Sequence, residues 1–150
     1  MQNKTPTILE LKELSLQVSL VIPYITMLVL FGSRATGNIR ANSDWDFAIL
    51  YDKEKYDIYQ TSHPLAFFEL YWLFGELFKL NSDHIDVVDL HKCSELKSHF
   101  VARDGIMLFE KTPGEFEAFR LNSLKSESEL KQFCENQYQH IESFLQRWGV

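Results

Sequence analysis

The chain has 150 residues, of which 45% are hydrophobic and 24% charged, so it holds enough apolar material for the core of one ordinary globular domain. Its formal net charge of -6 at pH 7 argues against long-range attraction to nucleic acid or to an anionic membrane, and we expect neither as a direct partner. The two cysteines, Cys93 and Cys134, are far apart and belong to no CxxC pattern, which argues against a disulfide scaffold and a zinc site. The N-terminus lacks the apolar segment of an export signal, so we expect a cytoplasmic protein.

Helical and strand-like patterns alternate in the first third of the chain. Apolar residues recur at helical spacing from Ile8 to Val21 and predict a first helix. The continuous apolar run from Ile25 to Phe31 stops at Gly32, as a buried strand would. A second strand is predicted from Asp46 to Tyr51, and the glycine-bearing loop between the two runs indicates that they are neighbours.

The segment from Pro64 to Leu80 is apolar on nearly all sides, but it is too short to span a bilayer. It predicts a buried or partner-facing helix with Ser62 available as N-cap. Its aromatic residues, Tyr71 among them, are predicted to be core residues rather than a platform for an adenine ring. Further elements are predicted downstream: a third strand at 85–90, a helix at 94–103 and a short edge strand at 106–109.

A helical segment is expected after Pro113. Ser126 and Glu129 have the spacing of a capping box, so we favour two helices, or one that is kinked there. The fold class predicted from these patterns is mixed α/β, with a small mixed sheet flanked by helices. We expect a single domain over the whole chain, with a core at about 8–111 and a helical C-terminal extension at about 113–149.

The most informative segment is LFGSRATGNIRANSDWDFAIL, in which Gly32 and Ser33 are followed, after ten intervening residues, by a DxD pair. A strand that ends in Gly-Ser and turns into a helix presents backbone N–H groups and a hydroxyl to an anion. Gly32 and Ser33 are therefore predicted to bind the triphosphate of a nucleotide, and Arg34 joins them because a guanidinium directly after Ser33 can meet a phosphate oxygen. The fixed pattern would occur by chance in roughly two of a thousand chains of this length.

Three aspartates supply the predicted metal and catalytic groups. Asp44 and Asp46 are two residues apart, so on a strand their carboxylates project from one face and can share Mg²⁺ ions, which prefer oxygen ligands. Asp86 adds a third carboxylate if its strand lies beside theirs. Two metal ions would then stabilise the attacking and leaving oxygens of an in-line displacement, and Asp86 would also accept the proton of the nucleophile. His84, two residues before Asp86, would share its face if the strand extends that far.

The motifs GSRATG and SDWDFAIL resemble the signature of the DNA polymerase beta-like nucleotidyltransferase superfamily. Within it, the chain is similar to the minimal nucleotidyltransferase (MNT) antitoxins of HEPN/MNT toxin–antitoxin systems, and the resemblance covers about Ile8 to Lys111. It implies the polymerase beta-like core, phosphate binding at Gly32 and Ser33, and metal binding at the three aspartates. It also implies transfer of AMP from Mg-ATP to a tyrosine of a HEPN ribonuclease toxin, which neutralises the toxin within a hetero-oligomeric complex.

Two other functions stay open at this point. One is a binding-only antitoxin that occludes its toxin; the intact carboxylates argue against it, although the apolar segment from Pro64 to Leu80 and the C-terminal helices offer a binding surface. The other is nucleotidyl transfer to a small hydroxylated compound such as an aminoglycoside. The short chain argues against that activity, because it leaves no second domain to build a deep pocket.

Overall fold

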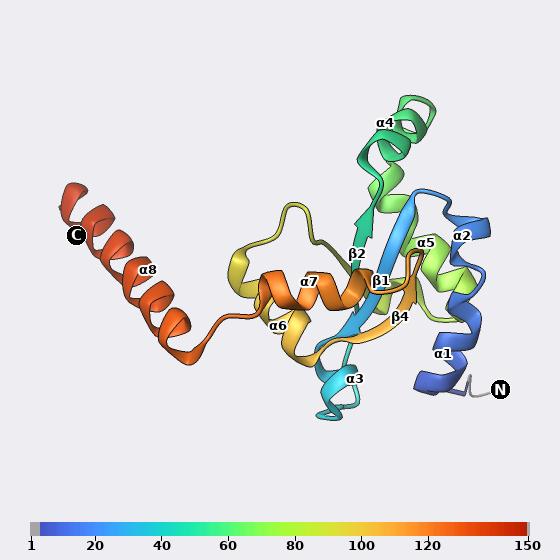
Figure 1. Cartoon of the computed structure of the whole chain (residues 1–150), viewed down its shortest axis with the longest axis horizontal. Coiled ribbons are helices and arrows are strands. Elements are labelled where there is room, and N and C mark those ends of the chain that lie inside the picture. The colour runs from blue at the N-terminus through green and yellow to red at the C-terminus, as the bar shows by residue number, and fades with distance from the viewer. Residues whose placement is uncertain (1–3, 150) are drawn as a thin grey trace.

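A four-stranded mixed sheet forms the centre of the protein in a computed structural model, which describes residues 4–149 (Figure 1). The strand order is β3-β2-β1-β4, with β1 antiparallel to both β2 and β4 and with β2 parallel to β3. The strands are β1 (Ile25–Phe31), β2 (Trp45–Tyr51), β3 (Ile85–Asp89) and β4 (Ile106–Glu110). The predicted mixed α/β class, the pairing of the first two strands and the edge position of the last one are confirmed.

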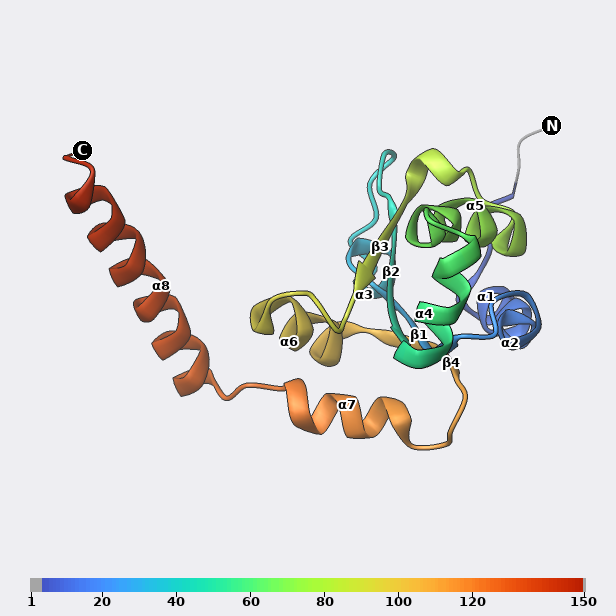
Figure 2. The same ribbon diagram turned by 90° about the horizontal axis from the view of Figure 1, so that it is seen from above.

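Helices cover both faces of this sheet (Figure 2). Phe47 and Ile49 of β2 point into the larger core, where Phe47 packs against Phe74 and Phe78 of a covering helix. Ala48, between them, points to the other face and belongs to a smaller core, as strand alternation requires. The larger core is covered by α1 (Ile8–Ser15), α2 (Val18–Val21), α4 (Lys53–Ser62) and α5 (Ala66–Phe78), and the smaller by α6 (Glu95–Asp104) and α7 (Glu115–Ser123).

The predicted first helix is divided into α1 and α2. The hydroxyl of the buried Ser15 donates to the carbonyl of Leu11 at 2.6 Å, a local bond that often bends helices. The next two N–H groups, of Leu16 and Gln17, bond three residues back rather than four and tighten the turn. The prediction of one continuous helix from Ile8 to Val21 was therefore wrong. Its apolar spacing nevertheless correctly marks Leu11 and Val18 as core residues.

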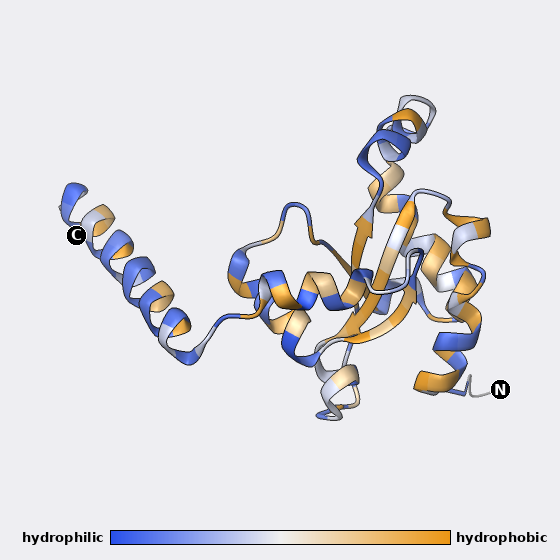
Figure 3. Cartoon of the chain, viewed as in Figure 1, coloured by the Kyte–Doolittle hydropathy of each residue, from blue (hydrophilic) through white to orange (hydrophobic). Residues whose placement is uncertain are grey.

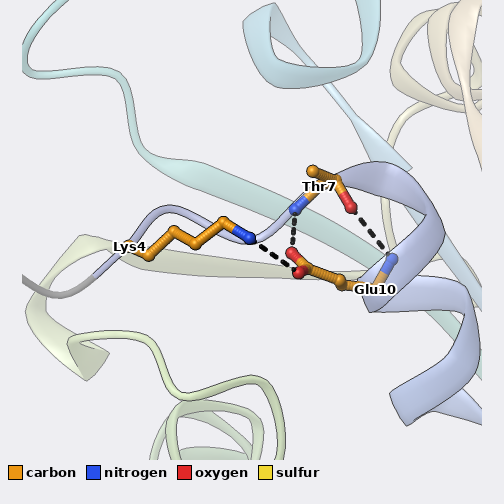
Figure 4. Close-up of polar contacts among 3 residues, drawn as sticks. All are labelled: Lys4, Thr7 and Glu10. Atoms are coloured by element: carbon orange, nitrogen blue, oxygen red, sulfur yellow. Dashed lines mark hydrogen bonds and ion pairs between the residues drawn. The ribbon is translucent and has the colours of Figure 1, made fainter.

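The start of α1 is fixed by a capping box (Figure 4). The N–H of Glu10 donates to the Thr7 hydroxyl at 3.1 Å, and the N–H of Thr7 donates to the Glu10 carboxylate at 2.7 Å. Lys4 donates to the same carboxylate at 3.2 Å. These bonds lower the pKa of Glu10, chiefly through the Thr7 backbone, and tie the N-terminal segment to the first turn.

The region between β2 and β3 contains a helix that the sequence patterns did not predict. Asp52 begins α4 by accepting a bond from the N–H of Lys55, and Ser62 ends that helix. The prediction of Ser62 as the N-cap of the following helix was wrong, because α5 begins after Leu65 without a side-chain cap. The apolar segment itself forms α5 as predicted.

The C-terminal segment forms two helices, as favoured from the sequence. Ser126 and Glu129 make the predicted capping box at the start of α8 (Glu127–Arg147). Whereas Phe116 and Phe119 of α7 pack against the smaller core, α8 has no buried residue and extends away from the sheet (Figure 1). Figure 3 shows apolar residues along α8 among polar ones. Within residues 4–149, no helix combines the length and apolar character needed to cross a membrane.

Candidate active site

The Gly-Ser turn follows β1 directly. Gly32 has φ 73° and ψ -159°, a backbone region that is essentially restricted to glycine, and α3 (Ser33–Thr36) begins at the next residue. The carbonyl of Gly32 accepts bonds from the N–H groups of Ala35 and Thr36, which closes the turn. The N–H groups of a first helical turn have no acceptor within the helix, so those of Ser33 and Arg34 are available to an anion as the motif predicts.

Asp46 lies directly against this turn. The pairing of β1 with β2 places it opposite Phe31, and a Cβ added to Gly32 would collide with its carboxylate oxygen Oδ2 and come within 3.1 Å of its Cγ. The missing side chain of Gly32 therefore does two things: it permits the unusual backbone conformation, and it leaves room for the Asp46 carboxylate. The position of the phosphate-binding turn and the position of the Asp46 carboxylate therefore depend on each other.

Two of the three aspartates predicted from the sequence, Asp46 and Asp86, lie on one face of the sheet, and Asp44 lies immediately before β2. Asp46 and Asp86 are Cα partners in the parallel pairing of β2 and β3, and Asp44 stands two residues before Asp46. Asp46 is half-buried, whereas Asp44 and Asp86 are exposed. The pKa of Asp46 is raised, first by burial and then by the negative charges of Asp86 and Asp44, while Lys97 opposes the rise. The strand pairing therefore brings Asp46 and Asp86 side by side, and Asp44 lies close enough for its charge to act on Asp46.

The donor set suits a hard divalent cation. Carboxylate oxygens are the ligands that Mg²⁺ prefers, and a bound cation would relieve the repulsion that raises the pKa of Asp46. Among residues 4–149, no three carboxylate, imidazole or thiol groups converge closely enough to enclose an ion, so at least one of the three aspartate side chains would have to turn toward the other two. Asp44 is exposed and precedes β2, so its side chain has room to turn.

Arg34 does not extend into the space above the phosphate turn. Its guanidinium donates from Nε and Nη2 to the carbonyl of Ser43, at 3.2 and 2.9 Å, and stacks over the ring of Trp45 at 4.2 Å from the ring centroid. These contacts brace the loop that leads to Asp44. Contact between Arg34 and a nucleotide stays a prediction, and the structure adds a bracing role that its place after Ser33 did not reveal.

Two further side chains contact the carboxylates, and a third lies near them. The hydroxyl of Tyr71 on α5 donates to Oδ1 of Asp86 at 3.3 Å, and Nδ1 of His84 lies 3.5 Å from Oδ1 of Asp44. Lys97 of α6 extends over the ring of Phe31, with Nζ 5.7 Å from the ring centroid. His84 lies in a 3-10 turn (Ser82–His84) directly before β3, and its contact is with Asp44. No sequence motif marks Tyr71 or Lys97, because helix packing places both.

A cavity beside the site does not include the carboxylates. It has a volume of about 290 Å³, and its lining includes Arg34, Trp45, Lys79 and His84 but none of the three aspartates. The carboxylates instead lie on an accessible part of the sheet.

Residues 18–113 match the protein family described as Polymerase beta, Nucleotidyltransferase. The match covers more than half of the chain and includes the Gly-Ser turn and all three aspartates. The protein belongs to this nucleotidyltransferase family, which confirms the resemblance seen in its motifs.

A curated relative, the protein adenylyltransferase MntA of Aphanizomenon flos-aquae (strain 2012/KM1/D3), is 57% identical over 150 residues, the full length of both chains. Among solved structures, a chain of a toxin–antitoxin crystallised with AMP-PNP has a TM-score of 0.55 at 23% identity, covering 95% of this chain and 94% of that chain. A chain of the complex between a tri-AMPylated Shewanella oneidensis HEPN toxin and an MNT antitoxin has a TM-score of 0.51 at 21% identity, covering 93% and 92%. These two structures share the fold.

Proposed function

We propose that the protein transfers AMP from Mg-ATP to a tyrosine hydroxyl of a cognate HEPN-type toxin and thereby neutralises it. The observation that carries the proposal is the contact of the Gly32 turn with Asp46, opposite Asp86, in a chain that is 57% identical over its full length to a protein adenylyltransferase. A turn that binds phosphate and a group of carboxylates that binds metal are the two parts that nucleotidyl transfer needs.

Each part of the site has a place in this reaction. The N–H groups of the turn and the Ser33 hydroxyl would bind the terminal phosphates, and the three aspartates would hold the magnesium. Two bound ions would stabilise the attacking and leaving oxygens during in-line displacement. The tyrosine oxygen would bond to the α-phosphorus while the bond from that phosphorus to pyrophosphate breaks. Asp86 would accept the proton that the tyrosine hydroxyl loses.

The accessible position of the site supports a large acceptor. Asp44 and Asp86 are exposed, and the nearby cavity excludes them, so a tyrosine on the surface of another protein can approach. A small hydroxylated acceptor such as an aminoglycoside would need an enclosing pocket for its affinity. In the related complex, an MNT antitoxin is bound to a HEPN toxin that carries AMP groups, which agrees with a protein acceptor here.

Occlusion without catalysis is the second candidate, and α8 is the observation in its favour. This helix and the residue that ends it carry apolar side chains that belong to neither core among residues 4–149: Leu130, Phe133, Ile141, Phe144, Leu145 and Trp148. Such a stripe is typical of a surface that binds another helix. The two candidates are compatible if α8 holds the toxin while the carboxylates modify it.

The deciding experiment uses the purified protein, the product of its neighbouring gene and ATP labelled at the α-phosphate. We expect Mg²⁺-dependent label on a toxin tyrosine, loss of the toxin's ribonuclease activity, and neither outcome with Asp46→Asn. If the Asp46→Asn variant neutralises the toxin as well as the wild type does, occlusion replaces transfer. Label found on small molecules alone would point to the aminoglycoside-type activity.

A further inference from the structure

We propose that Tyr71 is a positioning residue that fixes the orientation of Asp86, the third carboxylate, for metal binding. This inference rests on the proposed function and adds a residue to its site. Among the described residues, the Tyr71 hydroxyl is the group that donates a hydrogen bond to the Asp86 carboxylate, and its oxygen lies 3.3 Å from Oδ1. Asp86 is exposed and lies opposite the like charge of Asp46, so without a donor its side chain would rotate away.

The position of Tyr71 follows from the topology of the sheet. β3 is an edge strand, with β2 on one side, and α5 packs beside it. Tyr71 lies on α5, and its hydroxyl reaches the carboxylate of Asp86. A phenolic hydroxyl can donate and an ionised carboxylate can only accept, so the bond runs from Tyr71 to Asp86.

The ring and the hydroxyl of Tyr71 have separate functions. The ring packs against the larger core and makes an edge contact with Phe67, with ring centroids 6.4 Å apart. The hydroxyl alone extends to Asp86 and occupies Oδ1, which leaves Oδ2 to a ligand. Groups that hydrogen-bond a metal-binding carboxylate set its orientation, and their loss typically weakens metal binding 10- to 100-fold. Tyr71→Phe therefore removes the orienting bond and keeps the packing.

The chain provides a matched control. Tyr59 of α4 also donates to a carboxylate, that of Glu69 on α5, at 2.8 Å and away from the sheet face with the aspartates. Tyr59→Phe removes the same chemical group from the same kind of bond. Any general effect of losing a tyrosine–carboxylate bond on stability will appear in both variants, whereas an effect on metal binding is expected in Tyr71→Phe alone.

The test measures Mg²⁺ binding by the full chain at a fixed concentration of the non-hydrolysable analogue AMP-PNP, by titration calorimetry and by the shift in melting temperature. We expect Tyr71→Phe to weaken Mg²⁺ binding roughly tenfold, with a melting temperature without ligand no lower than that of Tyr59→Phe. In AMP transfer to the toxin, kcat should fall while the KM for the toxin stays unchanged. Tyr59→Phe should bind Mg²⁺ as the wild type does.

A double-mutant cycle with Asp86→Asn tests the route of the effect. If Tyr71 acts through the Asp86 carboxylate, Tyr71→Phe will weaken Mg²⁺ binding in the wild type and will have no further effect in Asp86→Asn. Wild-type Mg²⁺ binding by Tyr71→Phe, or effects of the two substitutions that simply add, would overturn the inference and leave the proposed function intact. If the wild type itself binds AMP-PNP without any dependence on Mg²⁺, the proposed function fails first.

Discussion

Replacing Gly32 by alanine tests whether the phosphate turn and the carboxylate of Asp46 form one unit. At φ 73° and ψ -159° a residue with a Cβ is strained by about 1–3 kcal/mol, which for a chain of this length lowers the melting temperature by about 2–12 °C. The added Cβ would also collide with Oδ2 of Asp46, so the carboxylate must move. We expect loss of stability together with loss of the stabilisation by Mg-ATP.

Gly37→Ala is the control, because Gly37 also has a positive φ, 90°, but a Cβ there meets no atom within 4 Å. The free energy of unfolding of this variant should fall by about 1–2 kcal/mol because of backbone strain, and Mg-ATP should still stabilise it as it does the wild type. Differential scanning fluorimetry with and without Mg-ATP measures both quantities. The argument is refuted if Gly32→Ala retains the full wild-type shift with Mg-ATP, since Asp46 would then tolerate the displacement.

Three further predictions follow from the same site and from the C-terminal helix. Asp46→Asn should raise the melting temperature at neutral pH, because folding raises the pKa of Asp46 and the ionised carboxylate therefore destabilises the folded state. This gain should vanish as the pH falls through the raised pKa toward 3.8, and a gain that persists in acid contradicts the assignment. Arg34→Lys keeps the charge but loses the two bonds that brace the loop at Ser43, so it should weaken Mg-ATP binding as much as Arg34→Gln does. If the lysine variant retains Mg-ATP binding, Arg34 acts by direct contact with phosphate instead. A chain ending at Lys125 should melt close to the wild-type temperature and bind Mg-ATP normally while losing affinity for the toxin, since α8 has no buried residue; a large drop in melting temperature would show that α8 is structural.

The site residues were predictable wherever a local pattern carries the information. The apolar run from Ile25 to Phe31 and the glycine after it mark a strand and a turn, and the DxD spacing places two carboxylates on one face. Asp86 was predictable as a carboxylate in a strand, but its position opposite Asp46 depends on a parallel pairing between segments far apart in the chain. The family resemblance implied metal binding at all three aspartates, but the pairing of their strands is seen only in the structure.

The remaining elements were missed because their signals are weak or non-local. In α4 the buried Tyr56 is accompanied by the half-buried Tyr59 and the exposed Ile58, so the helix shows no clear apolar period. Its one signal in the sequence was Asp52, an N-cap residue whose carboxylate accepts a bond from the N–H of Lys55. The contact of Tyr71 with Asp86 arises from the packing of α5 beside β3, which no spacing along the chain encodes. Tyr71 was correctly placed against the core, but its hydroxyl was overlooked.

The register of β3 on β2 links catalysis to correct folding. Asp86 faces Asp46 while its neighbour Val87 faces Phe47 and the larger core. A slip of β3 by one residue would reverse these faces and press Asp86 against aromatic rings, where an unpaired carboxylate is very unfavourable. The charge of Asp86, which the proposed reaction would use, therefore also disfavours the arrangement in which β3 is shifted by one residue. A chain in which β3 has paired stably with β2 therefore also has Asp86 next to Asp46.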